Sequence, residues 1–357
     1  MTKRENLLAM LRGEPFEEVP VEFSLCPALE EAYREKTGGT VPYAEYFGMP
    51  WGHIGDIKIP FDESKYVPYH PNLKKGGTID LWGVAHEPGS REAMHMTYMR
   101  CPLKNAETLE ELEAYPYPDF SVGDASHQKR EVEEIHARGL AAVGNMQCTV
   151  WETSWYLRGM ENLMADMMCD PEMAAYVFDK VTEQAIIRAQ SFAKAGADIL
   201  YLGDDIGMQH TPIMSMELYR EWLFPRLKKV IDAARAVKPD IVVFYHSCGF
   251  VTPFIPSLIE AGVDVLNPIQ SECMDFKEIY EQYGQQIAFH GTIGTQTTMP
   301  FASPEEVMQT VHRNLDIAVQ GKGKGLMVAP THLLEPEVPW ENILAYVEAC
   351  RSYRPKF

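Results

Sequence analysis

A histidine and a cysteine stand two residues apart in the segment FYHSCGF, residues 244–250. They follow a run of β-branched and aromatic residues that begins at Ile241, a pattern typical of a buried strand. Imidazole and thiolate groups are common zinc ligands, so His246 and Cys248 are candidate metal ligands. The alternative is structural: a strand-end histidine that bonds to the backbone, beside a buried and inert thiol. The pattern alone leaves both interpretations open.

Acidic side chains follow two other apolar runs. Asp204 and Asp205 end the segment ILYLGDD. Because adjacent side chains point to different sides, we expect at most one of them to enter a pocket and the other to cap a turn. Glu152 lies close to apolar neighbours, which would raise its pKa and make it a candidate general acid. The sequence therefore predicts catalytic roles within this group of three acids.

Further polar and aromatic side chains lie near the ends of expected strands. His332 follows the run LMVAP, and it gains weight as a ligand because it would share a rim with His246 and Cys248. The aromatic stripe at 151–156 is more typical of a helix packed onto a barrel than of a pocket lining. The candidate substrate-binding residues are Trp155, Tyr245, Gln270, His290 and Gln296.

The elements that must position these side chains alternate between apolar β-rich runs and amphipathic helical stretches. This alternation is typical of βα units around a parallel sheet. About eight such units predict an α/β fold of the (β/α)8 TIM barrel type, whose active site lies at the C-terminal ends of the strands. No G-x-G-x-x-G follows the early strands, which removes the usual reason to prefer an open sheet. Strands are expected at 141–144, 199–203, 241–246, 263–267, 287–291 and 326–329, with 19–23 as a candidate first strand.

The expected helices carry recognisable start signals. In the segment SPEEV, Ser303 can cap a helix, Pro304 suits its first position and Glu306 completes a capping box. Helices are expected over 217–237, 253–260 and 304–319.

The N-terminal third is less regular. Residues 78–99 predict two strands about Pro88 and Gly89, a hairpin that decorates the barrel. Residues 115–120, YPYPDF, predict an extended linker. We expect a single domain over 1–357, with an irregular part at about 1–127.

Composition excludes several classes of partner. The 357 residues carry a formal net charge of −19 and a pI near 5.0, which argues against binding to nucleic acid or to an anionic membrane. Seven scattered cysteines lack the density of a secreted disulfide scaffold, so a reducing cytoplasm is expected. The first residues contain no apolar core long enough for a signal peptide, and no run is long enough to span a membrane.

The second half of the chain resembles the uroporphyrinogen decarboxylase superfamily. The resemblance lies in the segments GDDIGMQHTPIMSMELYREWLFPRLKKVIDAA, VFYHSCGFVTPFIPSLIEAGVDVLNPIQ, FHGTIGTQTTMPFASPEEV and LMVAPTHLLEPEVPWENILAYVEA. It covers 140–350 well and the N-terminal third loosely. It implies a (β/α)8 barrel and one of two reactions: decarboxylation of porphyrinogens, or transfer of methyl groups to or from a corrinoid carried on a separate protein.

The decarboxylase branch reads its polyacidic substrate through an arginine-rich N-terminal segment. The corresponding segment, VPVEFSLCPALEEAYREKTGG, is acidic and lacks paired arginines, so the carboxylates of uroporphyrinogen would meet the wrong charge. The short segment GDIKIP leaves Asp56 as a counterpart of that branch's central aspartate. We therefore expect no porphyrinogen decarboxylation.

In the methyltransferase branch, the resemblance aligns His246 and Cys248 with the first two zinc ligands of a His-x-Cys-Gly motif. Thiol-methylating relatives have an acidic residue where this chain has Gln270, and a second cysteine where it has His332. The resemblance thus implies a zinc site of His246, Cys248 and His332, with Gln270 or water as the fourth donor. One thiolate instead of two leaves a more Lewis-acidic zinc, or no stable zinc.

That ligand set favours removal of a methyl group from a donor over methylation of a thiol, because the group left behind by the methyl must be neutralised by a metal or a proton. The resemblance therefore predicts a methyltransferase that moves methyl from a small methylated donor, such as a methyl ether, to a corrinoid protein. The alternatives are uroporphyrinogen decarboxylase, a thiol-methylating corrinoid methyltransferase, and a non-catalytic binding barrel.

Overall fold

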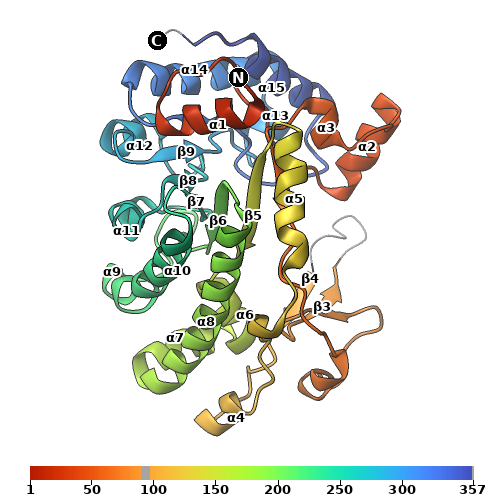
Figure 1. The fold of residues 1–357 in the computed structure, drawn as a ribbon, viewed down its shortest axis with the longest axis vertical. Coiled ribbons are helices and arrows are strands. Elements are labelled where there is room, and N and C mark those ends of the chain that lie inside the picture. Colours follow the sequence, from red (N-terminus) through yellow and green to blue (C-terminus); the bar gives the residue numbers. More distant parts are fainter. Residues whose placement is uncertain (90–96, 356–357) are drawn as a thin grey trace.

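A curled parallel sheet forms the centre of the protein in the computed structural model, which describes residues 1–89 and 97–355 (Figure 1). Its strands, in spatial order, are β1 (Trp51–Ile54), β5 (Ala141–Gln147), β6 (Ile199–Gly203), β7 (Val242–His246), β8 (Val265–Asn267), β9 (Ala288–His290) and β10 (Leu326–Met327). Each strand is parallel to its neighbours. All six strands expected from residue 141 onward are confirmed, and the architecture is that of a (β/α)8-type barrel.

The expected first strand at 19–23 is wrong, because this segment is extended but not paired as a strand. Pro20 has no N–H to donate to a ladder. The Tyr346 hydroxyl accepts a hydrogen bond from the Glu22 N–H and lies 3.0 Å from the carbonyl oxygens of both Glu22 and Val328. Just beyond, at Leu25, the chain forms a parallel bridge to Leu334, so the segment lies beside the end of the sheet that carries β10.

Side chains of the strands alternate between the inside and the outside of the barrel, as the two-residue period of a strand requires. One buried cluster holds inward positions such as Val143, Ile199 and Phe244. Four residues of α1 (Lys3–Arg12) belong to the same cluster: Leu7, Leu8, Met10 and Leu11. Helix α1 therefore closes the N-terminal end of the barrel. A capping box between Thr2 and Glu5 fixes the start of α1.

The outward positions, among them Leu200, Val243 and Tyr245, pack in a larger cluster under the surrounding helices. Those helices are α5 (Ser126–Ala137), α6 (Trp151–Arg158), α7 (Met160–Cys169), α8 (Pro171–Ala195), α10 (Phe224–Val237), α11 (Ile255–Ala261), α12 (Phe276–Tyr283), α13 (Thr298–Phe301), α14 (Pro304–Gly321) and α15 (Trp340–Ser352) (Figure 1). The capping box predicted for Ser303 and Glu306 is confirmed at the start of α14.

The other two expected helices begin with irregular turns. The helix expected at 217–237 starts with α9 (Met216–Leu218) and the π-helical turn η4 (Tyr219–Leu223), and continues as α10. The helix expected at 253–260 starts with the 3-10 turn η5 (Thr252–Phe254) and continues as α11. Both predictions are thus confirmed in position. Among the described residues, no helix combines the length and apolar character needed to cross a membrane.

The N-terminal third decorates the barrel with a small antiparallel sheet. Its strands are β2 (Thr78–Ile79), β3 (Ala85–Pro88) and β4 (Thr97–Arg100). Pro88 pairs with Thr97, which confirms the hairpin predicted within 78–99, although part of its connection, residues 90–96, lies outside the described residues. Residues 116–119 carry no helix or strand, as expected of a linker. The remaining elements are α2 (Pro27–Thr37), α3 (Tyr43–Phe47), η1 (Glu63–Lys65), η2 (Val67–Tyr69), α4 (Leu109–Glu113) and η3 (Phe120–Val122).

Candidate active site

A cavity of about 430 Å³ opens at the C-terminal end of the barrel strands. Much of its wall comes from inward positions of β1 and of β5 to β9, among them Trp51, Asn145, Gln147, Tyr201, His246, Asn267 and His290. The sheet alternation that buries apolar side chains in the barrel thus brings polar ones together above them. This location is where barrels of this type place their active sites.

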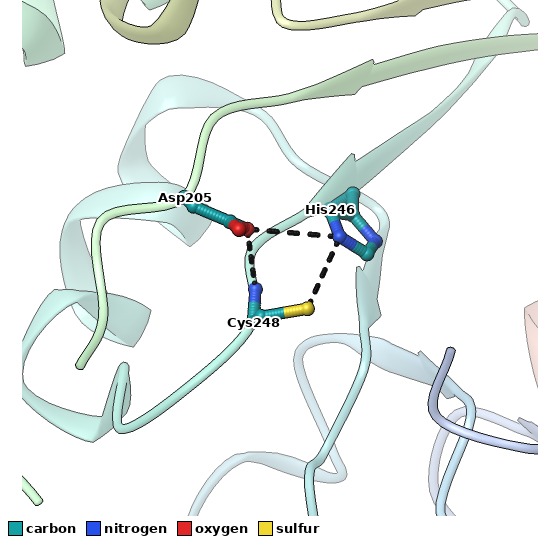
Figure 2. Close-up of side chains that lie close together, drawn as sticks. All are labelled: Asp205, His246 and Cys248. Atoms are coloured by element: carbon teal, nitrogen blue, oxygen red, sulfur yellow. Dashed lines mark hydrogen bonds and ion pairs between the residues drawn. The ribbon is translucent and has the colours of Figure 1, made fainter. Parts of the chain in front are cut away.

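Three potential metal ligands meet at one side of this cavity: Asp205, His246 and Cys248 (Figure 2). One ligand atom from each lies within 4.8 Å of the others. The Cys248 Sγ is 3.4 Å from the His246 Nε2, which is 3.6 Å from the Asp205 Oδ1. Burial raises the pKa of the Cys248 thiol, and the nearby Asp205 and Glu152 raise it further. A cation among these groups would favour the thiolate, so the donor set suits a divalent metal.

The loop after β7 holds Cys248 in place. The Cys248 N–H donates to Asp205 Oδ1 at 2.7 Å, and the Gly249 N–H donates to Gln270 Oε1 at 2.9 Å. Gly249 has a φ of 84°, and a Cβ at this position would come within 2.7 Å of the Gly207 backbone. Glycine is therefore required by both the backbone angle and the close approach.

Hydrogen bonds fix the orientation of the His246 ring. Asn267 Nδ2 lies 3.2 Å from the His290 carbonyl oxygen, which can only accept, so the Asn267 amide is oriented with Oδ1 toward His246 Nδ1. His246 Nδ1 must then carry the proton and donate it to Asn267. This leaves the lone pair of His246 Nε2 directed toward Cys248 and Asp205, as a metal ligand requires.

The two adjacent aspartates divide their roles as expected of neighbouring side chains. Asp205 lines the cavity. Asp204 is 4% exposed and accepts hydrogen bonds from the N–H groups of Val150 and Glu152, at the start of α6. Burial raises the pKa of Asp204 well above its usual value, and Glu152 adds to the shift. Asp204 thus caps α6 and does not line the cavity.

Glu152 is buried at the cavity wall. Its Oε1 accepts from the Tyr156 hydroxyl at 2.7 Å, and its Oε2 accepts from the Asp205 N–H at 3.1 Å. Burial raises the pKa of Glu152, with a further contribution from the charge of Asp205. The direction of this pKa shift agrees with the expectation from the sequence.

His332 lies on the rim of the same cavity, with its ring centroid 6.3 Å from that of His246. It also lines a neighbouring cavity of about 460 Å³, together with Cys248 and two of the predicted substrate-binding residues, Gln270 and Gln296. His246, Cys248 and His332 therefore converge at one mouth, as expected. Asp205 was expected to act in catalysis, but its carboxylate lies beside His246 and Cys248 as a third potential metal ligand.

Two predicted substrate-binding residues do not line either cavity. Tyr245 is 2% exposed and lies on the outer face of β7, because it alternates with the inward Phe244 and His246. Trp155 packs against the outer cluster and against the ring of Tyr156, whose centroid is 4.3 Å away. Trp155 thus belongs to a helix that packs onto the barrel, and it does not line the pocket.

The predicted cavity residue His290 joins three residues that were not singled out: Glu22, Tyr201 and Asn267. His290 Nε2 lies 3.0 Å from Glu22 Oε2, and the Tyr201 hydroxyl donates to Asn267 Oδ1 at 2.8 Å. Asn267 and Tyr201 were detectable, because they occupy inward positions of expected strands. Glu22 was not, since it comes from a segment 268 residues before His290.

Asp56 does not line the cavity at the barrel mouth. It follows β1 and pairs with Arg188 of α8, at 2.6 Å between Oδ2 and the guanidinium. This pairing leaves no support for Asp56 as a central aspartate in porphyrinogen decarboxylation.

These features define a (β/α)8-type barrel with a carboxylate, imidazole and thiol cluster at its mouth. Residues 100–353 match the model of the uroporphyrinogen decarboxylase (URO-D) family, so the chain belongs to that family. The match includes the segments on which the sequence resemblance rests, and that prediction is confirmed.

Relatives in this family include methyltransferases. A methylcobamide:CoM methyltransferase from Methanosarcina barkeri is 26% identical over an alignment that covers 99% of this chain and 98% of that protein. A methylated-thiol–coenzyme M methyltransferase from Methanosarcina mazei is 26% identical over 62% of this chain and 56% of that protein. Among solved structures, a methyltransferase from Methanosarcina mazei has a TM-score of 0.69 at 20% identity, with 98% of each chain covered. The structural similarity shows the fold, and the relatives support the methyltransferase branch.

Proposed function

We propose that the protein is a corrinoid-dependent methyltransferase that moves a methyl group from a small methylated donor, a methyl ether or a similar compound, to a corrinoid on a separate protein. The observation that carries this proposal is the cluster of Asp205, His246 and Cys248 at the wall of the barrel cavity. The methyltransferase relatives support the reaction class.

The cluster would hold a zinc ion through Cys248 Sγ, His246 Nε2 and an Asp205 oxygen; the His332 ring lies on the same rim, with its centroid 6.3 Å from that of His246. When bound, the metal supplies a Lewis acid that stabilises negative charge on a leaving oxygen. Gln270, the fourth donor expected from sequence, instead holds the loop by accepting from Gly249 N–H. Asn267 keeps the His246 ring in the tautomer that ligation needs.

Glu152 is the proposed general acid. Burial raises its pKa, which makes the protonated form more accessible than for an exposed glutamate, and it lines the cavity beside Asp205. As the methyl carbon leaves for the corrinoid, the donor heteroatom gains negative charge, and Glu152 would neutralise it with a proton. Asp204 is proposed to act indirectly, because it holds the N-terminus of α6, which carries Glu152. Glu152 is therefore the proposed acid, and Asp204 is the residue that positions it.

A thiol-methylating enzyme is the second candidate, and the names of the relatives favour it. Coenzyme M carries a sulfonate, which a protein usually binds through cations. Among the described residues that line the barrel cavity there is no lysine or arginine. The charge of this cavity therefore favours the demethylating direction. The decarboxylase alternative predicts conversion of uroporphyrinogen to coproporphyrinogen, which we expect not to occur.

The direction of transfer can be measured with the purified, zinc-loaded protein and reduced corrinoid, as free cob(I)alamin or on a carrier protein. Methanol, methylamines and methoxyaromatic compounds are supplied as donors, and methyl-cobalt formation is followed by absorbance. We expect at least one donor to methylate cobalt, and we expect Cys248→Ala to lose this activity while Cys169→Ala, on the surface of α7, retains it. If no donor methylates cobalt but methyl-cobalt is consumed by an added thiol, the thiol-methylating alternative is correct.

A further inference from the structure

The charged side chains that line the barrel cavity are acidic. Three carboxylates line it: Glu22, Glu152 and Asp205. Within the described part of the chain, no lysine or arginine contributes to the same lining. A ligand in this cavity therefore meets negative charge, unless each carboxylate is balanced in another way.

The three carboxylates differ in their surroundings. Asp205 and the Cys248 thiolate would together offset the charge of a divalent ion bound among them. Glu152 accepts hydrogen bonds from the Tyr156 hydroxyl and from the Asp205 N–H. Glu22 lies away from this cluster, and its carboxylate contacts His290 instead.

The protonation of His290 follows from the orientation of Asn267. The Asn267 amide presents Nδ2, a donor, to both the His290 carbonyl oxygen and the His290 Nδ1. His290 Nδ1 must therefore accept, so the ring is the neutral tautomer with its proton on Nε2. That proton is donated to Glu22 Oε2 at 3.0 Å. The partner of the Glu22 carboxylate is thus a hydrogen-bond donor and not a cation.

Glu22 is also held where it cannot easily reach bulk solvent. Its side chain is 13% exposed, and that of His290 is 5% exposed. The Tyr346 hydroxyl holds the Glu22 backbone at both its N–H and its carbonyl. A buried carboxylate without a positive partner is costly, and a bound cation would offset this cost.

Aromatic rings complete the wall around Glu22. Trp51 and Tyr201 project from β1 and β6 into the same cavity, and the Trp51 ring lies 5.6 Å from that of His290. Aromatic faces attract organic cations, most strongly where water is excluded. The wall near Glu22 therefore combines a fixed negative charge with rings that suit an ammonium group.

We propose that the methyl donor carries an ammonium group at the end away from its methyl, and that Glu22 is the residue that selects this charge. The proposal rests on the proposed function, because it assigns the reacting end of the donor to the cluster of Asp205, His246 and Cys248. Asn267 and His290 lie between His246 and Glu22 in the hydrogen-bond chain, so the two ends of the donor would bind at separate places.

Three small methyl ethers of similar length test this assignment: 2-methoxyethylamine, which is an ammonium ion at neutral pH, neutral 2-methoxyethanol, and anionic methoxyacetate. Their dissociation constants are measured by calorimetry on the zinc-loaded full chain. We expect the ammonium to bind at least about tenfold more tightly than methoxyacetate, since a charged hydrogen bond in a buried site is worth that much. Glu22→Gln should bring the affinities for the ammonium and for 2-methoxyethanol to within about twofold of each other.

The matched control is Glu348→Gln, which removes the same charge from the exposed side of α15 and should preserve the preference. Equal or tighter binding of methoxyacetate by the wild type would overturn the proposal, as would no ammonium binding at millimolar concentration. A preference unchanged in Glu22→Gln would overturn the role of Glu22. These titrations contain no corrinoid, so their failure leaves methyl transfer to be judged by the cobalt assay alone.

Discussion

Asp198 lies at the N-terminal end of the barrel, where its side chain is 2% exposed and surrounded by donors. Arg4 donates to both of its oxygens, and His136 and the Ala142 N–H also bond to it. At the opposite end, Glu152 is comparably buried but has a tyrosine hydroxyl and a backbone N–H as partners instead of cations. The same chemical group is thus neutralised at one end of the barrel and left without a cation at the other.

The electrostatic consequences are opposite. Burial opposes ionisation of Asp198, but the hydrogen bonds from Arg4, Ala142 and His136 outweigh it, and the pKa is lowered. Burial of Glu152 is not compensated in this way, and its pKa is raised. A carboxylate paired with cations contributes to stability, whereas burial without cations makes a carboxylate easier to protonate, as is common at functional sites. The comparison therefore separates the end of the barrel that stabilises the fold from the end at which we propose that the reaction occurs.

The largest expected effect is at the metal cluster. Cys248→Ala should reduce zinc affinity by more than about 100-fold. Loss of a residue that only hydrogen-bonds to a metal ligand already costs about 10–100-fold. Zinc content after dialysis against a weak chelator measures this, with Cys169→Ala as the matched control. The free energy of unfolding of the metal-free protein should change little by comparison. Full retention of zinc by Cys248→Ala would remove this residue from the ligand set.

The next largest effect is expected at Glu152, the proposed general acid. Glu152→Gln should lower turnover by about 10²–10⁴-fold, the usual contribution of a general acid, without loss of zinc. Glu161→Gln changes an exposed acid on the neighbouring helix α7 and should leave turnover unchanged. Wild-type turnover in Glu152→Gln would contradict the acid role and leave the metal role standing.

Much of this comparison was accessible from sequence, because alternation along a strand fixes which residues share a face. The runs that end in His246 and His290 were recognised as strands, and both histidines face the cavity. The same rule excludes Tyr245, the neighbour of His246. The strand β1 escaped detection because its four residues, WGHI, include a glycine and a histidine and carry little β-pattern.

The residues that sequence reasoning missed depend on contacts between distant segments. Glu22 becomes a cavity residue because Tyr346 holds its backbone and His290 holds its carboxylate. Asp204 and Asp205 are indistinguishable as adjacent acids, and the direction of the chain after β6 decides which one faces Cys248. Neither property is encoded in local periodicity, so both required the structure.

A smaller effect is expected at the stabilising end. Asp198→Asn removes the charge that balances Arg4 and should reduce the free energy of unfolding by about 1.5–3 kcal/mol, the range for hydrogen bonds to charged groups. Urea unfolding of the metal-free protein measures the change. Asp240→Asn, which breaks an exposed pair with Lys238, should cost less than about 1 kcal/mol. Equal losses in the two variants would show that burial of the Asp198 pair adds nothing.

The smallest effect, and the most discriminating, is the pH dependence of stability. The lowered pKa of Asp198 means that the unfolded chain binds more protons at this residue, so its contribution is present above pH ~4 and is lost as pH falls toward the folded pKa. The raised pKa of Asp204 means that the folded chain binds more protons, so stability falls as pH rises above ~4 toward the folded pKa.

The two substitutions should therefore change the pH profile with opposite signs. Asp198→Asn should flatten the acid loss of stability below pH ~4, and Asp204→Asn should remove a decline that begins above it, while its amide oxygen can still accept from Val150 and Glu152. Unfolding free energies measured from pH 3 to pH 8 for the wild type and both variants give the two differences. If both differences had the same sign, the two ends of the barrel would not treat buried carboxylates in opposite ways, and the division between a stabilising end and a reactive end would lose its electrostatic basis.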